Sequence, residues 1–353
     1  MKIGIVTVHD SNNYGSFLQA YALQKILEEY GHKVYFVRTR SKVYLKSIFI
    51  PPIAQKRFLK HPFQMIRERR LGKEKWKYFL EDQKIFKEID ANDLEKMDVV
   101  ILGSDEIWNI QVPVFQRDIF YGVGLKHVIA YAVSVGRAKK EEVLQYPNIV
   151  KNIKNVSKMM VRDLQTQDIV ETITGFVPQI VCDPTFLVDK SIYRHLSKGK
   201  VGLPDGYILI YSYEIDTELR LKIERFANEN RLKIVSACFY YDWADYNFVC
   251  GPLEFCEIME KARYVITTTF HGTIFSILNE KQFISFPASI KTNDLLKRLG
   301  LEDRIKDNAV SDQMISECLI QNRIDYIKVN ENIRDFREKS LKLLLKSIEE
   351  CGE

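Results

Sequence analysis

A histidine lies at the junction between two apolar runs in TTTFHGTIFSIL, residues 267–278 of the sequence. The pattern predicts a strand at 263–269 and a helix at 273–278, with His271 in the turn that joins them. Open α/β sheets place their sites at the carboxyl ends of strands, so His271 is a candidate catalytic acid or base. Gly272 beside it permits close approach of another group. The alternative is a junction histidine bonded to a backbone carbonyl.

Two cations at predicted strand ends could bind an anionic ligand. Arg162 ends a predicted strand at 158–163, and its guanidinium group suits bidentate contact with a carboxylate or a phosphate. Alternatively, Arg162 pairs with Asp163 or Asp183 and braces the domain. Lys291 follows the strand predicted after His271, where its ammonium group could contact phosphate or lie solvated in a loop.

Polar residues also follow the first predicted strand, at 2–8. Asn12, Asn13 and Tyr14 lie between this strand and the helix predicted at 17–30, so their amides and ring could meet a sugar. Asparagine side chains also simply form turns, which is the alternative interpretation.

The motif GSDEIWN, residues 103–109, follows another predicted strand. Ser104 and Asp105 lie at the end of that strand, and Asp105 could accept hydrogen bonds from sugar hydroxyls. Trp108 could stack on the face of a sugar or belong to the core. Glu106 is a second carboxylate, which could take part in the site or point into solvent.

Strands and helices alternate along the chain, which predicts two parallel sheets covered by helices. The strands are predicted at 2–8, 34–37, 97–103, 127–136, 158–163 and 178–188 in the first half, and at 206–213, 232–239, 263–269 and 282–287 in the second. We therefore expect an α/β protein with two Rossmann-like domains, 1–188 and 189–353, facing each other across a cleft. The first carries a basic helical insertion at about 38–90, and the second ends in a helix at about 330–349.

Composition indicates a soluble globular protein, because hydrophobic residues make up 46% of the 353 and charged residues 28%. No apolar run approaches the ~20 residues that span a bilayer, and the first residues lack the features of a signal peptide. We expect a cytoplasmic protein. The cysteines form no C-x-x-C pair and the histidines show no metal-ligand spacing, so we expect no metal site.

The net charge of +5 is unevenly distributed. From Arg38 to Lys87 there are fifteen lysines and arginines but four acidic residues, a local charge of +11 that leaves about −6 elsewhere. Aromatic and aliphatic residues interleave with these cations. Such a segment could contact an anionic membrane surface, or it could be a solvated helix that packs its apolar stripe on the protein.

Six motifs occur in a fixed order: NNYGSFLQAYALQ, GSDEIWN, YAVSVG, VRD, VCDPTFLV and TTTFHGTIFSILNEKQFISF. Together, over roughly residues 3–300, they resemble the polysaccharide pyruvyl transferase family. The resemblance implies a GT-B-like fold. It also implies transfer of the pyruvyl group of phosphoenolpyruvate to two hydroxyls of a sugar, giving a cyclic ketal and phosphate. The implied acceptors are sugars of cell-surface polysaccharides, often carried on a lipid.

The resemblance also assigns expected roles to residues. It places Arg162 near the donor and a functional lysine near Lys291, and His271 would take a proton from the sugar hydroxyl or deliver one to the enol methylene. The first domain would hold the acceptor and the second the donor. Neither a cofactor nor a nucleic-acid partner is expected. The basic segment would dock the cytoplasmic enzyme at the inner face of the membrane, near a lipid-linked acceptor. The chain departs from the family pattern at Glu106, usually glutamine, and in LQTQD after VRD.

Two other functions remain open. A GT-B-type glycosyltransferase would use a nucleotide sugar, and retaining enzymes of that kind often carry two glutamates separated by seven residues. No such pair occurs around Glu254, Glu257, Glu260 or Glu280. A non-catalytic glycan-binding relative is the third possibility, and the presence of both His271 and Arg162 argues against it.

Overall fold

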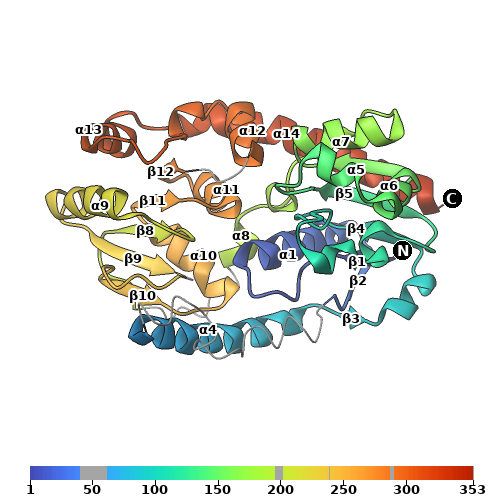
Figure 1. Ribbon diagram of the computed structural model, residues 1–353, viewed down its shortest axis with the longest axis horizontal. Helices are drawn as coiled ribbons and strands as arrows, with labels where there is room; N and C mark the ends of the chain where they lie inside the picture. Colours follow the sequence, from blue (N-terminus) through green and yellow to red (C-terminus); the bar gives the residue numbers. More distant parts are fainter. Residues whose placement is uncertain (40–61, 195–201, 238, 287–289, 353) are drawn as a thin grey trace.

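Two parallel sheets form the frame of the protein in the computed structural model, which describes residues 1–39, 62–194, 202–237, 239–286 and 290–352. The first sheet has seven strands in the order β3-β2-β1-β4-β5-β6-β7, and the second has five in the order β10-β9-β8-β11-β12. Each sheet is the centre of one lobe (Figure 1). The predicted α/β architecture is therefore confirmed.

The strands of the first lobe are β1 (Lys2–Val6), β2 (Lys33–Val37), β3 (Glu88–Ile89), β4 (Val99–Leu102), β5 (Val128–Val133), β6 (Lys158–Val161) and β7 (Gln179–Ile180). Those of the second are β8 (Tyr207–Tyr211), β9 (Lys233–Ala237), β10 (Tyr246–Phe248), β11 (Tyr264–Thr267) and β12 (Gln282–Ser285). The α-helices are α1 (Tyr14–Glu29), α4 (Pro62–Asp82), α5 (Lys140–Leu144), α6 (Pro147–Lys154), α7 (Leu164–Thr174), α8 (Ser191–Arg194), α9 (Thr217–Glu229), α10 (Pro252–Lys261), α11 (Phe270–Leu278), α12 (Ile290–Leu299), α13 (Asp312–Ser316) and α14 (Tyr326–Gly352).

The central strands are apolar along their whole length. All residues of β4, β5 and β8 are buried, because helices cover both faces of each sheet. The edge strands β3 and β10 are short, with two and three residues, and the apolar pattern of the sequence did not predict them.

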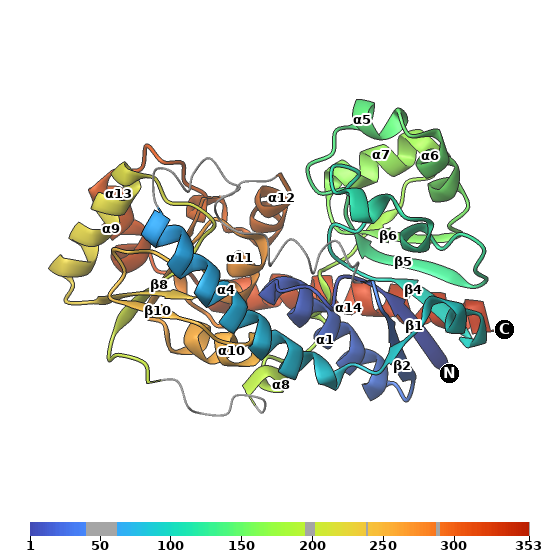
Figure 2. The same cartoon turned by 60° about the horizontal axis from the view of Figure 1, so that its bottom comes forward.

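Helix α14 begins earlier and ends later than the helix predicted at 330–349. It reaches the first lobe (Figure 2), where Leu344 and Ile348 are buried and the Ser340 hydroxyl accepts a hydrogen bond of 3.0 Å from the backbone N–H of Cys182. The predicted second domain, 189–353, therefore includes a helix that packs against the first sheet.

Helix α4 forms the second part of the predicted basic insertion, whose residues 40–61 lie outside the described part of the chain. It runs along both lobes (Figures 1 and 2) and buries Trp76 and Phe79, as the packed-helix interpretation predicts. Within the described ranges, no helix combines the length and the apolar character needed to cross a membrane.

The two lobes share one hydrophobic cluster. Tyr14, at the start of α1, is fully buried between the rings of Phe79 and Phe255, whose centroids lie 5.1 and 4.6 Å from its own. Its hydroxyl donates a hydrogen bond of 2.8 Å to the carbonyl of Cys250 in the second lobe. These contacts hold the start of α1, and with it the end of the first sheet, against the second lobe.

Candidate active site

A charged cluster lies where the carboxyl ends of the two sheets meet. Arg162 follows β6 and Asp183 follows β7, and an Arg162 Nη1–Asp183 Oδ2 distance of 2.9 Å joins them. The Ser104 hydroxyl, after β4, lies 3.3 Å from both atoms. The Arg162 side chain is 2% exposed and the Asp183 side chain 1%. The ion pair with Asp183, which was the predicted structural alternative for Arg162, is therefore present.

Arg162 retains donors that the protein does not use. Its Nε and Nη2 atoms are buried and make no hydrogen bond to any described residue. The Asp105 carboxylate lies 3.9 Å from Nη2. Burial opposes the charge of Arg162, but Asp183 and Asp105 raise the pKa of the guanidinium above its usual value. A buried cation with unused donors is suited to binding an anion.

His271 reaches this cluster from the second lobe. Its Nε2 atom lies 3.5 Å from Asp183 Oδ2, so a residue after β11 meets a residue after β7. Although burial acts in the opposite direction, His271 and Arg162 hold the pKa of Asp183 well below its usual range. An ionised carboxylate facing one ring nitrogen fixes the orientation of an imidazole.

Helix α11 begins at Phe270, three residues before the predicted start at 273. The Thr269 hydroxyl caps the helix by accepting a hydrogen bond of 2.9 Å from the backbone N–H of Gly272. His271 therefore lies in the first turn of the helix and not in the turn before it. The prediction missed this cap because the three threonines continue the β-branched pattern of the strand.

A glycine on α1 makes room for the histidine ring. A Cβ atom at Gly15 would lie 2.1 Å from Nδ1 of His271, a distance that no side chain tolerates. Gly272 is packed in the same way, since a Cβ there would lie 2.2 Å from the Thr267 hydroxyl oxygen. Glycine is thus required at both positions by close packing.

Lys291, in α12, forms an ion pair with Glu106 of the first lobe. Glu106 also accepts a hydrogen bond of 3.0 Å from the Asn109 side chain. Burial would raise the pKa of Glu106, but the Lys291 ammonium lowers it to about 2. Lys291 is buried, so it is not the solvated loop lysine of the alternative interpretation.

Phe270 packs between the charged side chains. The guanidinium carbon of Arg162 lies 4.6 Å from its ring centroid and the ammonium of Lys291 lies 4.9 Å from it. The ring meets that of His271 edge-on, at 5.4 Å between centroids. One aromatic ring therefore sets the spacing of two cations and the histidine.

Asp105 adopts an unusual backbone conformation, with a φ of +86°. Its carboxylate accepts hydrogen bonds from the Ser16 hydroxyl at 2.5 Å and from the backbone N–H of Glu106 at 2.8 Å. Its carbonyl accepts a bond of 3.1 Å from the backbone N–H of Ser134. A non-glycine residue in this region is uncommon, and such conformations concentrate at functional sites.

Other residues that were predicted to bind the sugar lie outside the charged cluster. Trp108 is 1% exposed and its indole N–H donates to the carbonyl of Phe120 at 2.9 Å, so it belongs to the core rather than to a sugar-binding surface. Tyr14 is buried between the lobes. Asn13 caps α1 by accepting bonds from Gly15 and Ser16, which is the turn-forming alternative. Asn12 is partly exposed beside it.

Sequence reasoning did not select Asp183, Ser16, Phe270 or Gly15 as site residues. Asp183 had a signal, because it lies in the segment 178–188 that was predicted as a strand next to the one ending at Arg162, but it entered only as an ion-pair partner. Ser16, Phe270 and Gly15 lie within quoted motifs. Their roles depend on contacts between the lobes, which no local pattern reveals.

One group in the described part of the chain could hold a metal ion, formed by His9, Asp10 and Glu88. Its ligand atoms are already bonded: His9 Nε2 lies 3.2 Å from Glu88, and both Asp10 oxygens accept bonds from Thr39. The bonds from His9 and Arg38 lower the pKa of Glu88 to about 2. The group is therefore a bonded network between β1, β2 and β3.

Solved structures similar to this chain support the fold. The UDP-GlcNAc 2-epimerase from Methanocaldococcus jannaschii is 12% identical, with 96% of this chain and 100% of that chain covered and a TM-score of 0.54. The enzyme from Neisseria meningitidis, bound to UDP-GlcNAc, is 11% identical, with 99% and 100% covered and a TM-score of 0.53. These are GT-B-fold proteins, and at this identity they inform on the fold alone.

A search of curated proteins gave no significant match. The model of the family described as polysaccharide pyruvyl transferase matches residues 13–289, which include every residue of the charged cluster except Lys291. The match covers well over half of the 353 residues and begins at the cap of α1. The chain belongs to the polysaccharide pyruvyl transferase family.

Proposed function

We propose that this protein transfers the pyruvyl group of phosphoenolpyruvate to two hydroxyls of a polysaccharide or lipid-linked oligosaccharide sugar. The products are a cyclic ketal and inorganic phosphate. The observation that carries the proposal is that His271 and Arg162 both contact Asp183, which brings a proton-transfer group close to a buried cation with unused donors. Membership of the family supports the same reaction.

The donor carries a carboxylate and a phosphate, so it needs cations at both ends. Arg162 offers Nε and Nη2 to one anionic group of the donor. Lys291 offers a point charge to the other group once the donor replaces Glu106 as the ion-pair partner of Lys291. Both cations flank Phe270, so the donor would lie at the seam between the lobes.

The reaction balances through two proton movements. The enol methylene gains a proton and becomes the methyl group, and a sugar hydroxyl bonds to the adjacent carbon. A second hydroxyl then bonds to that carbon as the carbon–oxygen bond to phosphate breaks. Each hydroxyl loses its proton, one of which balances the proton gained by the methylene while the other leaves on the phosphate. His271 moves one of these protons, as acid to the methylene or as base to a hydroxyl. Asp183 orients the ring for either role.

Phosphate release from phosphoenolpyruvate tests the proposal directly. The native protein is incubated with a panel of free and lipid-linked oligosaccharides, beside His271→Ala and the control His127→Asn. His127 is exposed and has a φ of +52°, a conformation that asparagine tolerates. We expect acceptor-dependent release that falls at least ~100-fold in His271→Ala and is unchanged in the control.

Two outcomes would overturn the proposal. Absence of release with every acceptor, together with calorimetric binding of a nucleotide sugar, would indicate a glycosyltransferase. Absence of release with binding of a glycan alone would indicate a non-catalytic relative. In either case His271 would be a structural residue of the lobe interface.

We also infer that α4 brings the enzyme to the anionic inner face of a membrane. Its solvent side carries Arg70, Lys73 and Lys77 together with the exposed apolar residues Ile66 and Tyr78. Cations beside apolar side chains are typical of helices that bind at a membrane surface. Co-sedimentation with phosphatidylserine vesicles should weaken as salt rises and in Arg70→Glu/Lys77→Glu. Vesicle binding that is unchanged both by higher salt and by Arg70→Glu/Lys77→Glu would show that this side of α4 does not bind the membrane.

A further inference from the structure

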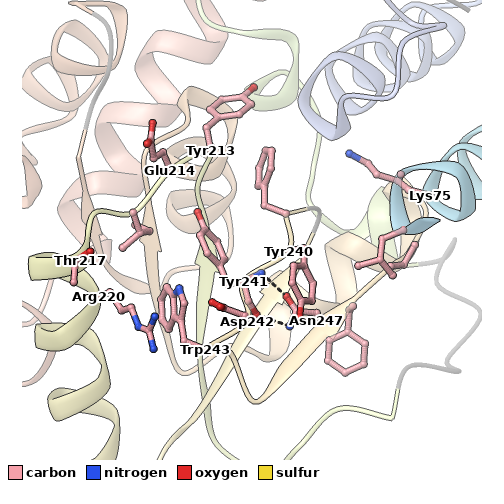
Figure 3. A pocket seen from close by; sticks show the side chains of 16 residues that line it. Lys75, Tyr213, Glu214, Thr217, Arg220, Tyr240, Tyr241, Asp242, Trp243 and Asn247 are labelled. Atoms are coloured by element: carbon pink, nitrogen blue, oxygen red, sulfur yellow. Dashed lines mark hydrogen bonds between the residues drawn. The ribbon is translucent and has the colours of Figure 1, made fainter. Parts of the chain in front are cut away.

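A cavity of about 650 Å³ lies on the second lobe, between α4 and the loops that follow β8 and β9 (Figure 3). We call it the aromatic pocket, because Tyr213, Phe239, Tyr240, Tyr241 and Trp243 line it. Its volume falls within the ~300–1,000 Å³ of small-molecule sites. None of the residues of the charged cluster lines it.

The wall of the aromatic pocket is held in place by hydrogen bonds. The Tyr241 hydroxyl donates to the carbonyl of Ser212 at 2.9 Å. The Asn247 side chain accepts from the backbone N–H of Tyr241 and donates to its carbonyl, both at 2.8 Å, as the dashed lines in Figure 3 indicate. A ligand therefore meets a preformed wall and does not have to order it.

Two aromatic side chains of this wall are exposed in whole or in part. Tyr213 is 62% exposed although its ring meets that of Phe239 edge-on at 4.8 Å, and Trp243 is half-buried beside Tyr241, at 5.1 Å between centroids. The C–H faces of a pyranose ring pack well on such rings, because they are apolar and slightly positive against a negative π face.

The charged residues that line the aromatic pocket balance, with Glu214 and Asp242 against Lys75 and Arg220, which favours a neutral ligand over a phosphate group. Glu214 and Asp242 are exposed at its rim, and their carboxylates pair with no residue in the described ranges. The carboxylate of Asp216 already caps α9 by accepting from Leu219 at 2.8 Å. The guanidinium of Arg220 is paired with Glu224 at 3.0 Å. Carboxylates with free acceptor positions suit the hydroxyls of a neutral sugar.

The aromatic pocket adjoins the site through both of its walls. The backbone N–H of Tyr213 donates to the Thr268 hydroxyl at 3.2 Å, three residues before His271. On the other wall, the Lys75 ammonium lies 4.5 Å from the ring centroid of Tyr14, the residue before Gly15. The loops after β8 and β9 lie at the same carboxyl edge of the parallel second sheet as His271, so a glycan bound here is on the edge of the lobe that carries the site.

We propose that the aromatic pocket binds a neutral saccharide unit of the glycan, one that is distant from the sugar that reacts. That this glycan is the acceptor rests on the function proposed above, whereas binding itself does not. The second lobe would then hold part of the glycan, in contrast to the sequence-based prediction that the first lobe holds the acceptor.

A printed array of bacterial oligosaccharides provides the probes, and calorimetry with the best-bound soluble oligosaccharide gives the Kd without phosphoenolpyruvate. Tyr213→Ala and Trp243→Ala are compared with the control Tyr30→Ala, since Tyr30 is 48% exposed at the end of α1 and does not line the pocket. We expect a Kd raised at least ~10-fold in both pocket variants and unchanged in the control.

Binding that persists in Tyr213→Ala and Trp243→Ala would overturn the proposal, as would an array without any bound glycan. Binding of UDP that is lost in the same two variants would also overturn it, in favour of a nucleotide site. The measurement is repeated in His271→Ala. If His271→Ala binds the glycan and the native protein releases no phosphate, the proposed reaction is refuted, whereas the assignment of the aromatic pocket as a glycan site is retained.

Discussion

His271 and Asp183 come from different lobes, and their contact depends on the missing side chain of Gly15. The carboxylate is shared, because Asp183 also neutralises Arg162 and accepts from Ser104. A single buried oxygen atom thus positions both the proton-transfer group and the anion-binding group. We expect Asp183 to be the most sensitive carboxylate of the protein.

Asp183→Asn keeps the shape of the side chain and removes its charge. The change leaves Arg162 buried without its main counter-ion, so we expect a lower melting temperature and phosphate release reduced by ~10²–10⁴-fold in the folded fraction. Asp163→Asn is the matched control, because Asp163 is equally buried and asparagine preserves its cap on α7. Similar release by both variants would show that Asp183 has no special role.

Residue types in the sequence indicated which chemistry to expect, but not which side chains face solvent. His271, Arg162, Asp105 and Lys291 meet at the seam between the lobes. Tyr14 and Trp108 are equally plausible sugar ligands by type, yet both are core residues. Burial of this kind follows from contacts with distant segments, such as Phe255 with Tyr14, that strand-end position does not specify.

At the scale of elements, the helix starts position the site. α1 begins at the Asn13 cap and α11 at the Thr269 cap, and the two first turns meet at Gly15 and His271. Each cap satisfies backbone N–H groups that would otherwise lack partners, so the two turns are fixed before they meet. The precision of the His271 position therefore comes from two short polar side chains.

Gly15→Ala tests this packing. Alanine favours a helix over glycine by up to ~1 kcal/mol, so α1 itself should not be harmed. The new methyl group must displace His271, and we expect phosphate release to fall at least ~10-fold while the far-ultraviolet circular dichroism stays native. Gly202→Ala is the control, because a Cβ there meets no atom of the described residues within 4 Å. Full activity of Gly15→Ala would mean that the ring position is not critical.

Central strands were predictable from sequence because parallel strands buried on both faces are continuous apolar runs. The edge strands β3 and β10 were not, since two or three residues carry no recognisable pattern. The start of α11 was placed too late for a similar reason. A cap is one polar side chain, and three consecutive threonines do not reveal which one caps the helix.

At the scale of the whole molecule, the lobes are joined by apolar and ionic contacts. The cluster around Tyr14 contains residues of both lobes, and the ion pair of Glu106 with Lys291 crosses the seam. A shared apolar core restricts the relative motion of two domains. We therefore expect donor exchange to require local rearrangement around Lys291 rather than wide separation of the lobes.

The pH dependence of Glu106→Gln tests the contribution of the ion pair. The pKa of Glu106 is lowered from 4.5 to about 2, which corresponds to a stabilisation on the order of 1–3 kcal/mol after allowance for partial solvent screening. A depressed carboxyl pKa stabilises the folded state above about pH 4.5, and this stabilisation is lost as the pH falls toward 2.

Melting temperatures of the native protein and Glu106→Gln should therefore differ at pH 7, and the difference should shrink as the pH falls from about 4.5 toward 2. Asp93→Asn serves as the control, since Asp93 pairs with Lys96 at the surface of the first lobe and should have little effect at any pH. A difference that stays constant from pH 7 to pH 3 would show that the charge of Glu106 does not stabilise the fold.

The return of α14 to the first sheet has a consequence for how the chain matures on the ribosome. Domains generally fold in the order in which they are synthesised. Here the first lobe is translated first, but Leu344 and Ile348, which are buried against it, are translated after the whole second lobe. Until α14 is synthesised, the nascent first lobe therefore exposes the apolar face that this helix later covers. We expect chaperones to bind this early folding intermediate.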